Sequence, residues 1–351
     1  MFRCCHACVF DSITTSAPMS RRKLWIVSIA VSLGLSYCIY QVLFATYMPR
    51  DSFSGSLDPL SADGLQIRNN LLAHVRALSL DIGERNLQKH RQLEAAAEYI
   101  ADKLKQSGYE VRFQQYEVAG KPVSNVEAVL GGAELAQQNI VIGAHYDTVA
   151  GTPGANDNAS GVAAVLELAR LMKTRQPRRT VRFVLFPNEE PPYFQTPQMG
   201  SMVYARDLKQ RNVRVEAMLS LETIGAYSDK PGSQTYPGGL DALYPSTGNF
   251  IGFVGNTESG ALVRRVIRAF RDSTRFPSEG AAAPASLPGV GWSDHWSFWQ
   301  HGYPAVMVTD TAPFRYEHYH AASDTPDKLD FDRMAIVVAG LQHVTGHLAN
   351  E

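Results

Sequence analysis

The stretch from Ile140 to Gly161, IVIGAHYDTVAGTPGANDNASG, constrains the fold more than any other part of the sequence. Residues 140–142 are apolar and β-branched, which is typical of a buried strand, and residues 159–172 carry apolar side chains at helical spacing. His145 follows the strand and Asp157 precedes the helix. In open α/β sheets ligands bind at this place. A packed His145 and an Asp157 that only caps the helix are the plain alternative.

Apolar strands and amphipathic helices alternate along the rest of the chain. Strands are expected at 111–118, 125–130, 180–186, 217–221, 250–254 and 305–309. Helices are expected at 63–80, 88–106, 201–211, 258–272 and 332–348. Residues 226–249 and 278–291 are rich in Gly, Pro and Ser or Ala, and are interpreted as loops. This alternation predicts an α/β fold with a mostly parallel central sheet and helices on both faces.

The N-terminal segment differs from the rest of the chain. Residues 24–48 contain no charged side chain, and the basic triplet 21–23 precedes them. This pattern predicts a transmembrane anchor with a cytoplasmic N-terminus and an extracytoplasmic catalytic domain, with a cleaved signal peptide as the alternative. Met19, just before the basic triplet, is a candidate initiator. The expected organisation is a cytoplasmic segment 1–23, an anchor 24–48, a juxtamembrane linker 49–65 and a catalytic domain 66–351.

Composition excludes some functions. A formal net charge of -1 and the lack of a basic, aromatic-rich stripe argue against a nucleic-acid partner. All four cysteines lie before or inside the apolar segment, so the catalytic domain has no disulfide framework and no thiol chemistry. These cysteines are Cys4, Cys5, Cys8 and Cys38.

Acidic and histidine residues recur just after the expected strands. Glu189 and Glu190 follow one strand, Glu222 follows another, and His320 follows the last by a loop. Each alone has a plain explanation, such as a solvated turn or an exposed histidine. Because the carboxyl ends of parallel strands meet at one edge of a sheet, we expect these side chains to converge with His145 and Asp157 on a metal site.

Five motifs resemble the di-zinc exopeptidases, a family that includes bacterial secreted aminopeptidases, glutamate carboxypeptidases and glutaminyl cyclases. They are GAHYDT at 143–148, NDNASG at 156–161, NEE at 188–190, LETIG at 221–225 and YHAASDTPDKLD at 319–330. The resemblance covers about residues 65–350 and implies the family's three-layer sandwich. It implies that His145 and Glu222 hold one zinc ion, that Glu190 and His320 hold a second, and that Asp157 bridges them. It also implies that Glu189 is the general base and that the peptide bond after Asp157 is cis. The family often has Asp at the position of Glu222.

The chemistry of these residues agrees with the resemblance. Imidazole and carboxylate ligands suit zinc, and three carboxylates with one bridging hydroxide would neutralise two Zn²⁺ ions. Asp147, two residues after His145, is placed to accept the other imidazole N–H. Tyr319 resembles a tyrosine that supports the substrate carbonyl in some of these aminopeptidases, although a plain packing role is an alternative. Asp294, in GWSDHWSFW, is expected to line the pocket.

The leading hypothesis is a membrane-anchored zinc aminopeptidase that hydrolyses N-terminal residues from peptides. A glutaminyl cyclase is the first alternative, because SDHWSF at 293–298 looks like a cyclase motif. Cyclases tend to have Trp-His where this chain has Tyr319-His320, which favours the peptidase. A receptor-like relative with a dead site, as in the transferrin receptor, is the second alternative, and the intact set of ligands with Glu189 argues against it.

Overall fold

The computed structural model describes residues 21–351 of the chain. The chain divides into two compact units, residues 1–44 and residues 45–351. Helix α1 (Arg21–Thr46) forms the described part of the first unit and continues just beyond it. Its portion Ser28–Thr46 is long and apolar enough to cross a membrane, a property that signal sequences share. Met19 and the first three cysteines lie outside the described residues.

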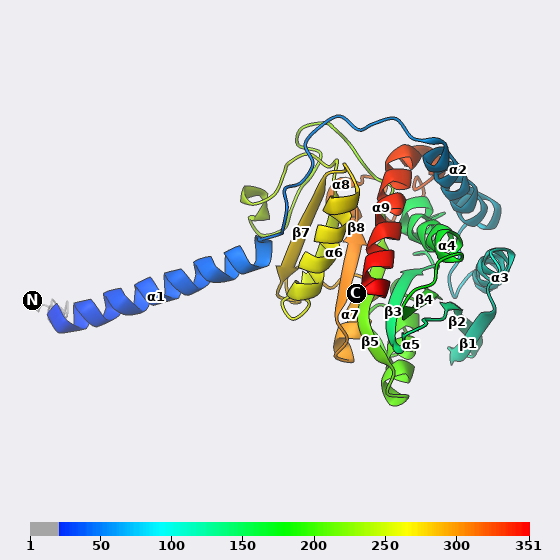
Figure 1. The fold of residues 1–351 in the computed structure, drawn as a ribbon, viewed down its shortest axis with the longest axis horizontal. Coiled ribbons are helices and arrows are strands. Elements are labelled where there is room, and N and C mark those ends of the chain that lie inside the picture. Colours follow the sequence, from blue (N-terminus) through cyan, green and yellow to red (C-terminus); the bar gives the residue numbers. More distant parts are fainter. Residues whose placement is uncertain (1–20) are drawn as a thin grey trace, which may run out of the picture. The chain divides into compact units, whose positions relative to one another are not determined.

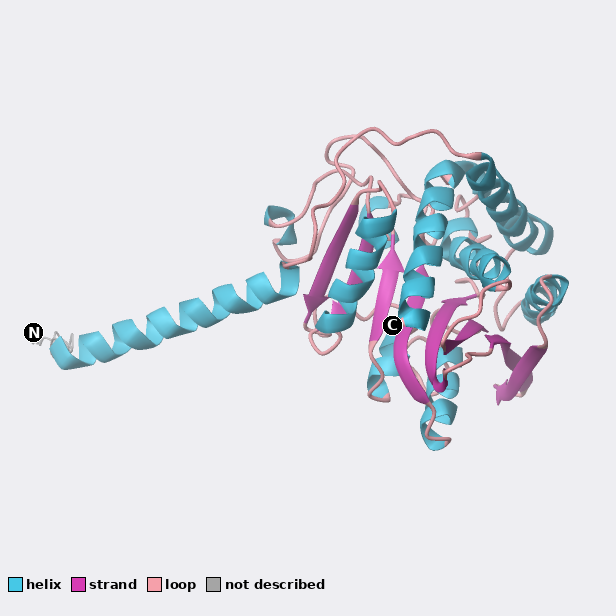
Figure 2. Cartoon of the chain, in the orientation of Figure 1, coloured by secondary structure: helices cyan, strands magenta, loops and turns pink. Residues whose placement is uncertain are grey.

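The second unit is built on one eight-stranded sheet (Figures 1 and 2), in the order β1-β2-β4-β3-β5-β8-β6-β7. The strands are β1 (Val111–Val118), β2 (Lys121–Leu130), β3 (Leu135–His145), β4 (Arg179–Phe186), β5 (Arg214–Glu222), β6 (Ile251–Asn256), β7 (Ser278–Ala283) and β8 (Ala305–Thr309). The pairs β3-β4, β3-β5, β5-β8 and β6-β7 are parallel. The pairs β1-β2, β2-β4 and β6-β8 are antiparallel. The sheet is therefore mixed and mostly parallel, and its centre is parallel as the sequence predicts.

Helices cover both faces of the sheet because its central strands are apolar on both sides. Along β3, Ile140 and Ile142 pack into one core cluster and Val141 packs into the other, as the two-residue period of a strand requires. The first cluster lies under α2 (Ala62–Arg76), α3 (His90–Gln106), α4 (Gly161–Met172), α6 (Gly260–Ser273) and α9 (Phe331–Asn350). The second lies under α5 (Gly200–Gln210) and α7 (His295–Gln300). Figure 1 shows α6 and α9 together in front of the strands.

One predicted loop is in part a strand. Residues 278–291 were expected to be irregular, but Ser278–Ala283 form the edge strand β7, which pairs in parallel with β6. The segment reads SEGAAA, and Gly and Ala have low β propensity, so the sequence pattern gives no strand signal. Pairing with β6 supplies the backbone hydrogen bonds that local propensity does not predict. Two short helices complete this region, α7 and α8 (Ala312–Arg315).

Candidate metal centre

The sheet delivers the chemically active side chains to one edge. Strand β3 ends at His145 and strand β5 ends at Glu222, so both side chains stand at the carboxyl ends of neighbouring parallel strands. Strand β4 ends at Phe186, and a turn follows in which Asn188 has a φ of 61°. This turn brings Glu189 and the residue after it to the same edge.

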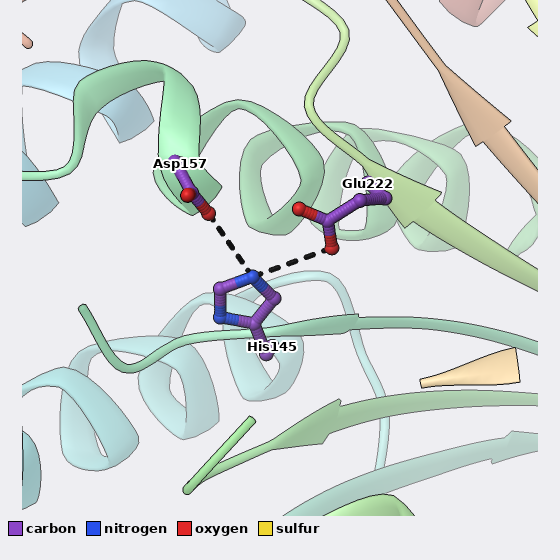
Figure 3. A group of neighbouring side chains, drawn as sticks. All are labelled: His145, Asp157 and Glu222. Atoms are coloured by element: carbon purple, nitrogen blue, oxygen red, sulfur yellow. Dashed lines mark ion pairs between the residues drawn. The ribbon is translucent and has the colours of Figure 1, made fainter. Parts of the chain in front are cut away.

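His145 lies at the centre of the group (Figure 3). Its side chain is fully buried. Its Nε2 lies 3.2 Å from Oδ1 of Asp157 and 3.4 Å from Oε2 of Glu222. Its Nδ1 lies 3.4 Å from Oδ1 of Asp147. One imidazole therefore faces two carboxylates on one side and a third on the other.

Asp157 connects this group to a second one. Its Oδ2 lies 3.1 Å from Nε2 of His320, and the same nitrogen lies 3.3 Å from Oε2 of Glu190. Asp157 thus belongs to two groups of potential metal ligands, one with His145 and Glu222 and one with Glu190 and His320. The structure brings together all five side chains that the sequence predicts as ligands. The peptide bond between Asp157 and Asn158 is cis, as the resemblance implies.

Glu189 lies beside the two groups. Its Oε2 is 3.9 Å from Nε2 of His145, farther than the carboxylates of Asp157 and Glu222. Geometry also permits a third candidate group of His145, Glu189 and Glu190, so distance alone does not assign Glu189 its role. The carboxylate of Asp147 accepts the backbone N–H groups of Glu189 and Glu190, each at 3.1 Å. Asp147 therefore holds the backbone of the glutamate turn and also faces the Nδ1 side of the His145 imidazole.

The buried donor atoms fit a metal site. Both ring nitrogens of His145, both carboxylate oxygens of Asp157 and Oε1 of Glu190 are buried and have no hydrogen-bond partner in the described part of the chain. Buried polar atoms without partners are rare, because each costs free energy unless something compensates it. Imidazole nitrogen and carboxylate oxygen are ligands that zinc prefers, so a cation between these residues would supply the partners that the protein does not.

The electrostatics of the cluster lead to the same conclusion. Burial raises the pKa of Glu189 well above its usual value and raises the pKa of Glu190 to about 7. Burial also raises the pKa of Glu222. For His145, burial acts to lower the pKa, but the carboxylates of Glu222 and Glu189 raise it well above its usual value. The buried carboxylates of this cluster outnumber the positive charges that could neutralise them, which favours binding of a cation.

Tyr319 and Asp294 lie at the margins of the cluster. The ring of Tyr319 stacks on the ring of His320 with centroids 3.9 Å apart, so it contacts a predicted ligand directly. Asp294, just before helix α7, is fully buried, and neither carboxylate oxygen has a hydrogen-bond partner among the described residues. Burial raises the pKa of Asp294 to about 7. His295 next to it bonds to the carbonyl of Val290 and has a structural role.

Sequence reasoning missed two carboxylates that hold the Asp157 turn. Asp324 accepts the backbone N–H groups of Asn156 at 2.8 Å and Asp157 at 3.1 Å. Asp310 accepts the side-chain amide of Asn156 at 3.0 Å and the hydroxyl of Thr223 at 2.6 Å. Asp324 lies within the motif at 319–330, so a signal for it was present in the sequence, whereas no motif contains Asp310.

Arg85 is a third missed residue. It is fully buried, and its guanidinium donates to the carbonyls of Tyr146 at 2.7 Å, Pro153 at 2.7 Å and Gly154 at 2.9 Å. These bonds span the loop between His145 and the Asp157 turn. A single arginine in an irregular stretch carries no periodic signal, so its role emerges only from the fold.

The fold and the cluster define a class of protein, namely α/β enzymes with an imidazole and carboxylate metal centre at the carboxyl ends of parallel strands. Residues 125–344 match Peptidase family M28, and the chain belongs to this family of zinc metallopeptidases. The chain is 40% identical over 276 residues to the uncharacterized protein YfbL of Escherichia coli (strain K12). The aligned region covers 76% of this chain and 84% of YfbL.

Solved structures with the same fold include two kinds of enzyme. A zinc aminopeptidase from Bacillus subtilis, BSAP, superposes with a TM-score of 0.65 at 14% identity, covering 81% of this chain and 95% of that one. The glutaminyl cyclase of Fimbriiglobus ruber superposes with a TM-score of 0.62 at 22% identity, covering 85% of this chain and 99% of that one. At these identities the likeness establishes the fold and leaves the reaction to be argued from the site.

Proposed function

We propose that the chain is a zinc-dependent aminopeptidase that hydrolyses N-terminal residues from peptides. One observation carries the proposal, namely that two groups of potential ligands share Asp157, and that every ligand except the exposed His320 is buried. His145 and Glu222 would hold one zinc ion, Glu190 and His320 the second, and Asp157 would bridge them. A pair of ions held in this way would stabilise both the attacking and the leaving group of a hydrolysis.

The chain's own residues supply the proton transfers. The zinc ions, when bound, contribute Lewis acidity at the scissile carbonyl and lower the pKa of water. Glu189 takes a proton from the attacking water, whose oxygen bonds to the carbonyl carbon. Glu189 then gives this proton to the leaving nitrogen as the C–N bond breaks. Asp147 holds the backbone of the glutamate turn, and Tyr319 would contact the substrate carbonyl.

The N-terminal helix suggests where the reaction would take place. We propose that residues 24–48 anchor the chain as a single transmembrane helix, with residues 1–23 in the cytoplasm and residues 66–351 outside it. The basic triplet 21–23 supports this orientation, because positive charge is retained on the cytoplasmic side. The extended length of α1, Arg21–Thr46, favours an anchor over a cleaved signal sequence.

Cyclisation of N-terminal glutamine is the second candidate reaction. Asp294 favours it, because a buried carboxyl group with a raised pKa near Glu222 can hold a proton for a transfer at an amide. The fold likeness to a glutaminyl cyclase is consistent with it. The pairing of His145 and Glu222, which completes the first ligand group, favours the hydrolase, and so does Tyr319 in place of tryptophan.

One assay separates the two reactions. The zinc-loaded protein is offered a panel of fluorogenic aminoacyl substrates and, in parallel, peptides with N-terminal glutamine, each with and without a chelator. Release of the fluorophore that depends on zinc supports the aminopeptidase. Loss of 17 Da from the glutamine peptide, with no release from the aminoacyl panel, would replace it with the cyclase.

A further inference from the structure

A cavity of about 110 Å³ adjoins the metal centre, and Glu222 and Tyr319 contribute to its lining. Its remaining lining comes from strands β6, β7 and β8, from the loops that follow β5 and β7, and from the segment after β8 that includes α8. An engineered cavity of about 150 Å³ holds one benzene molecule, so a space of this size holds one side chain. We refer to it as the Glu279 cavity, after the acidic residue of β7 that lines it.

A row of paired residues crosses the sheet along the wall of the Glu279 cavity. Glu222 is in register with Thr309, Thr309 with Gly252, and Gly252 with Glu279. All four line the cavity, and Gly252 leaves space there because it has no side chain. Neighbouring strands lie ~4.8 Å apart, so three steps separate the backbones of Glu222 and Glu279 by roughly 14 Å. A long substrate side chain bridges such a distance and a short one does not.

The walls of the Glu279 cavity are aromatic and its charge is negative. Tyr236 stacks on Tyr244 with centroids 5.7 Å apart, and Trp292 stacks on Phe314 with centroids 6.1 Å apart. Glu222 and Glu279 are the charged residues of the lining, and no Lys, Arg or His of the described chain joins them. Aromatic faces and a carboxylate both attract a cation, and aliphatic stems pack on aromatic rings.

Glu279 has no ion-pair partner within 4 Å among the described residues. Burial raises the pKa of its carboxyl group, and Arg271 and Ser52 act in the opposite direction. The guanidinium of Arg271 is engaged elsewhere, donating to the hydroxyl of Ser278 at 2.9 Å and to the carbonyl of Arg50 at 2.5 Å. A half-buried carboxylate without a direct cationic partner is free to bind one from a ligand.

We propose that the Glu279 cavity binds the side chain of the substrate's N-terminal residue and that Glu279 selects lysine or arginine at this position. This proposal rests on the aminopeptidase function and adds its substrate class. The aliphatic stem would lie against the aromatic walls, and the ammonium or guanidinium group would meet the Glu279 carboxylate. Neutral side chains of the same length would fill the cavity but leave Glu279 unpaired.

The test compares charged substrates with neutral ones of matched length. The zinc-loaded full chain is assayed with coumarin amides of lysine and norleucine, and of arginine and citrulline. We expect kcat/KM to be about tenfold or more higher for the charged member of each pair, the effect of one hydrogen-bonded ion pair. Glu279→Gln should reduce each ratio by about tenfold. Glu258→Gln, an exposed glutamate that does not line the cavity, should leave the ratios unchanged.

The outcomes separate this inference from the function on which it rests. Ratios near one in the wild-type enzyme, or ratios that Glu279→Gln does not change, would overturn the role of Glu279 while leaving an active aminopeptidase. A wild-type enzyme that releases no amino acid from any of the four substrates would overturn the aminopeptidase function instead. If circular dichroism shows that Glu279→Gln does not fold, the wild-type ratios of kcat/KM alone decide whether the cavity selects a charged side chain.

Discussion

Asp324 holds the backbone of Asp157, since its Oδ2 accepts the Asp157 N–H at 3.1 Å and its Oδ1 accepts the neighbouring Asn156 N–H at 2.8 Å. Asp324→Asn replaces one accepting oxygen with an NH₂ group that opposes an N–H. We expect zinc affinity to fall by about 10- to 100-fold, as for other residues that orient metal ligands. Competition with a fluorescent zinc chelator measures this. Asp327→Asn, a change at an exposed carboxylate in the same segment, is the matched control.

An affinity for zinc that Asp324→Asn leaves equal to the wild type would show that Asp157 keeps its position without this support. If both Asp324→Asn and Asp327→Asn bind zinc with wild-type affinity, other contacts of the turn, such as those of Asp310 and Arg85, hold Asp157 in position.

Zinc removal should destabilise the fold. Asp157, Glu190 and Glu222 are buried close together, and without cations between them their negative charges repel. Zinc at 1,000 times its Kd stabilises the folded state by about 4 kcal/mol, which corresponds to roughly 6 °C in Tm for a chain of this size. Differential scanning fluorimetry with a chelator, and again after excess zinc, measures the change. An unchanged Tm would mean that zinc does not bind the folded chain.

The segment before α2 should contribute to stability and not to catalysis. Leu57 and Leu60 pack against the core, and the hydroxyl of Ser61 accepts the backbone N–H of Gly64 in the first turn of α2. A chain that starts at Ala45 should therefore keep full activity, whereas one that starts at Ala62 should lose about 3 kcal/mol of unfolding free energy. Urea unfolding and kcat/KM of the two truncations measure this. Inactivity of a folded 45–351 chain would show that the catalytic unit needs the N-terminal segment.

Acid should weaken the fold through His74. Burial, together with the nearby positive charges of Lys103 and Arg170, lowers the pKa of His74 from 6.5 to about 4. As pH falls below 6.5 the unfolded chain binds the proton first, so stability present above pH 6.5 is lost progressively down to about pH 4. The loss should be about 3 kcal/mol, since each unit of pKa difference is worth ~1.4 kcal/mol. Urea unfolding of His74→Gln should show a flatter pH dependence in this window. Exposed His343→Gln should retain the wild-type slope, and an unchanged slope in both would exclude His74.

The sequence predicts most of the fold because most elements carry their own signal. The strand that ends at His145 and the helices over 88–106 and 201–211 are found within a few residues of their expected positions. Strand β7 is not predictable in this way, because its Gly and Ala residues form a strand only through pairing with β6. Tertiary contacts overrule local propensity there.

The candidate ligands could be predicted because their chemistry is rare and their positions recur at strand ends. The residues that support them could not, because Asp310 and Arg85 act through backbone and amide groups that have no sequence signature. The Glu279 cavity could not be predicted from the sequence either. The cavity depends on the register of four strands, and one of them, β7, has no local sequence signal.

The adjacent glutamates Glu189 and Glu190 both belong to a candidate ligand group with His145, so geometry alone does not separate the general base from the metal ligand. Zinc content and turnover should be measured on the same preparations of Glu189→Gln and Glu190→Gln. If Glu189 is the general base, Glu189→Gln should bind two zinc ions per chain and lose ~10²–10⁴ in kcat, because an amide does not accept the proton of water. Glu190→Gln should lose one zinc ion. Normal turnover in Glu189→Gln, or its loss of a zinc ion, would contradict the proposed mechanism.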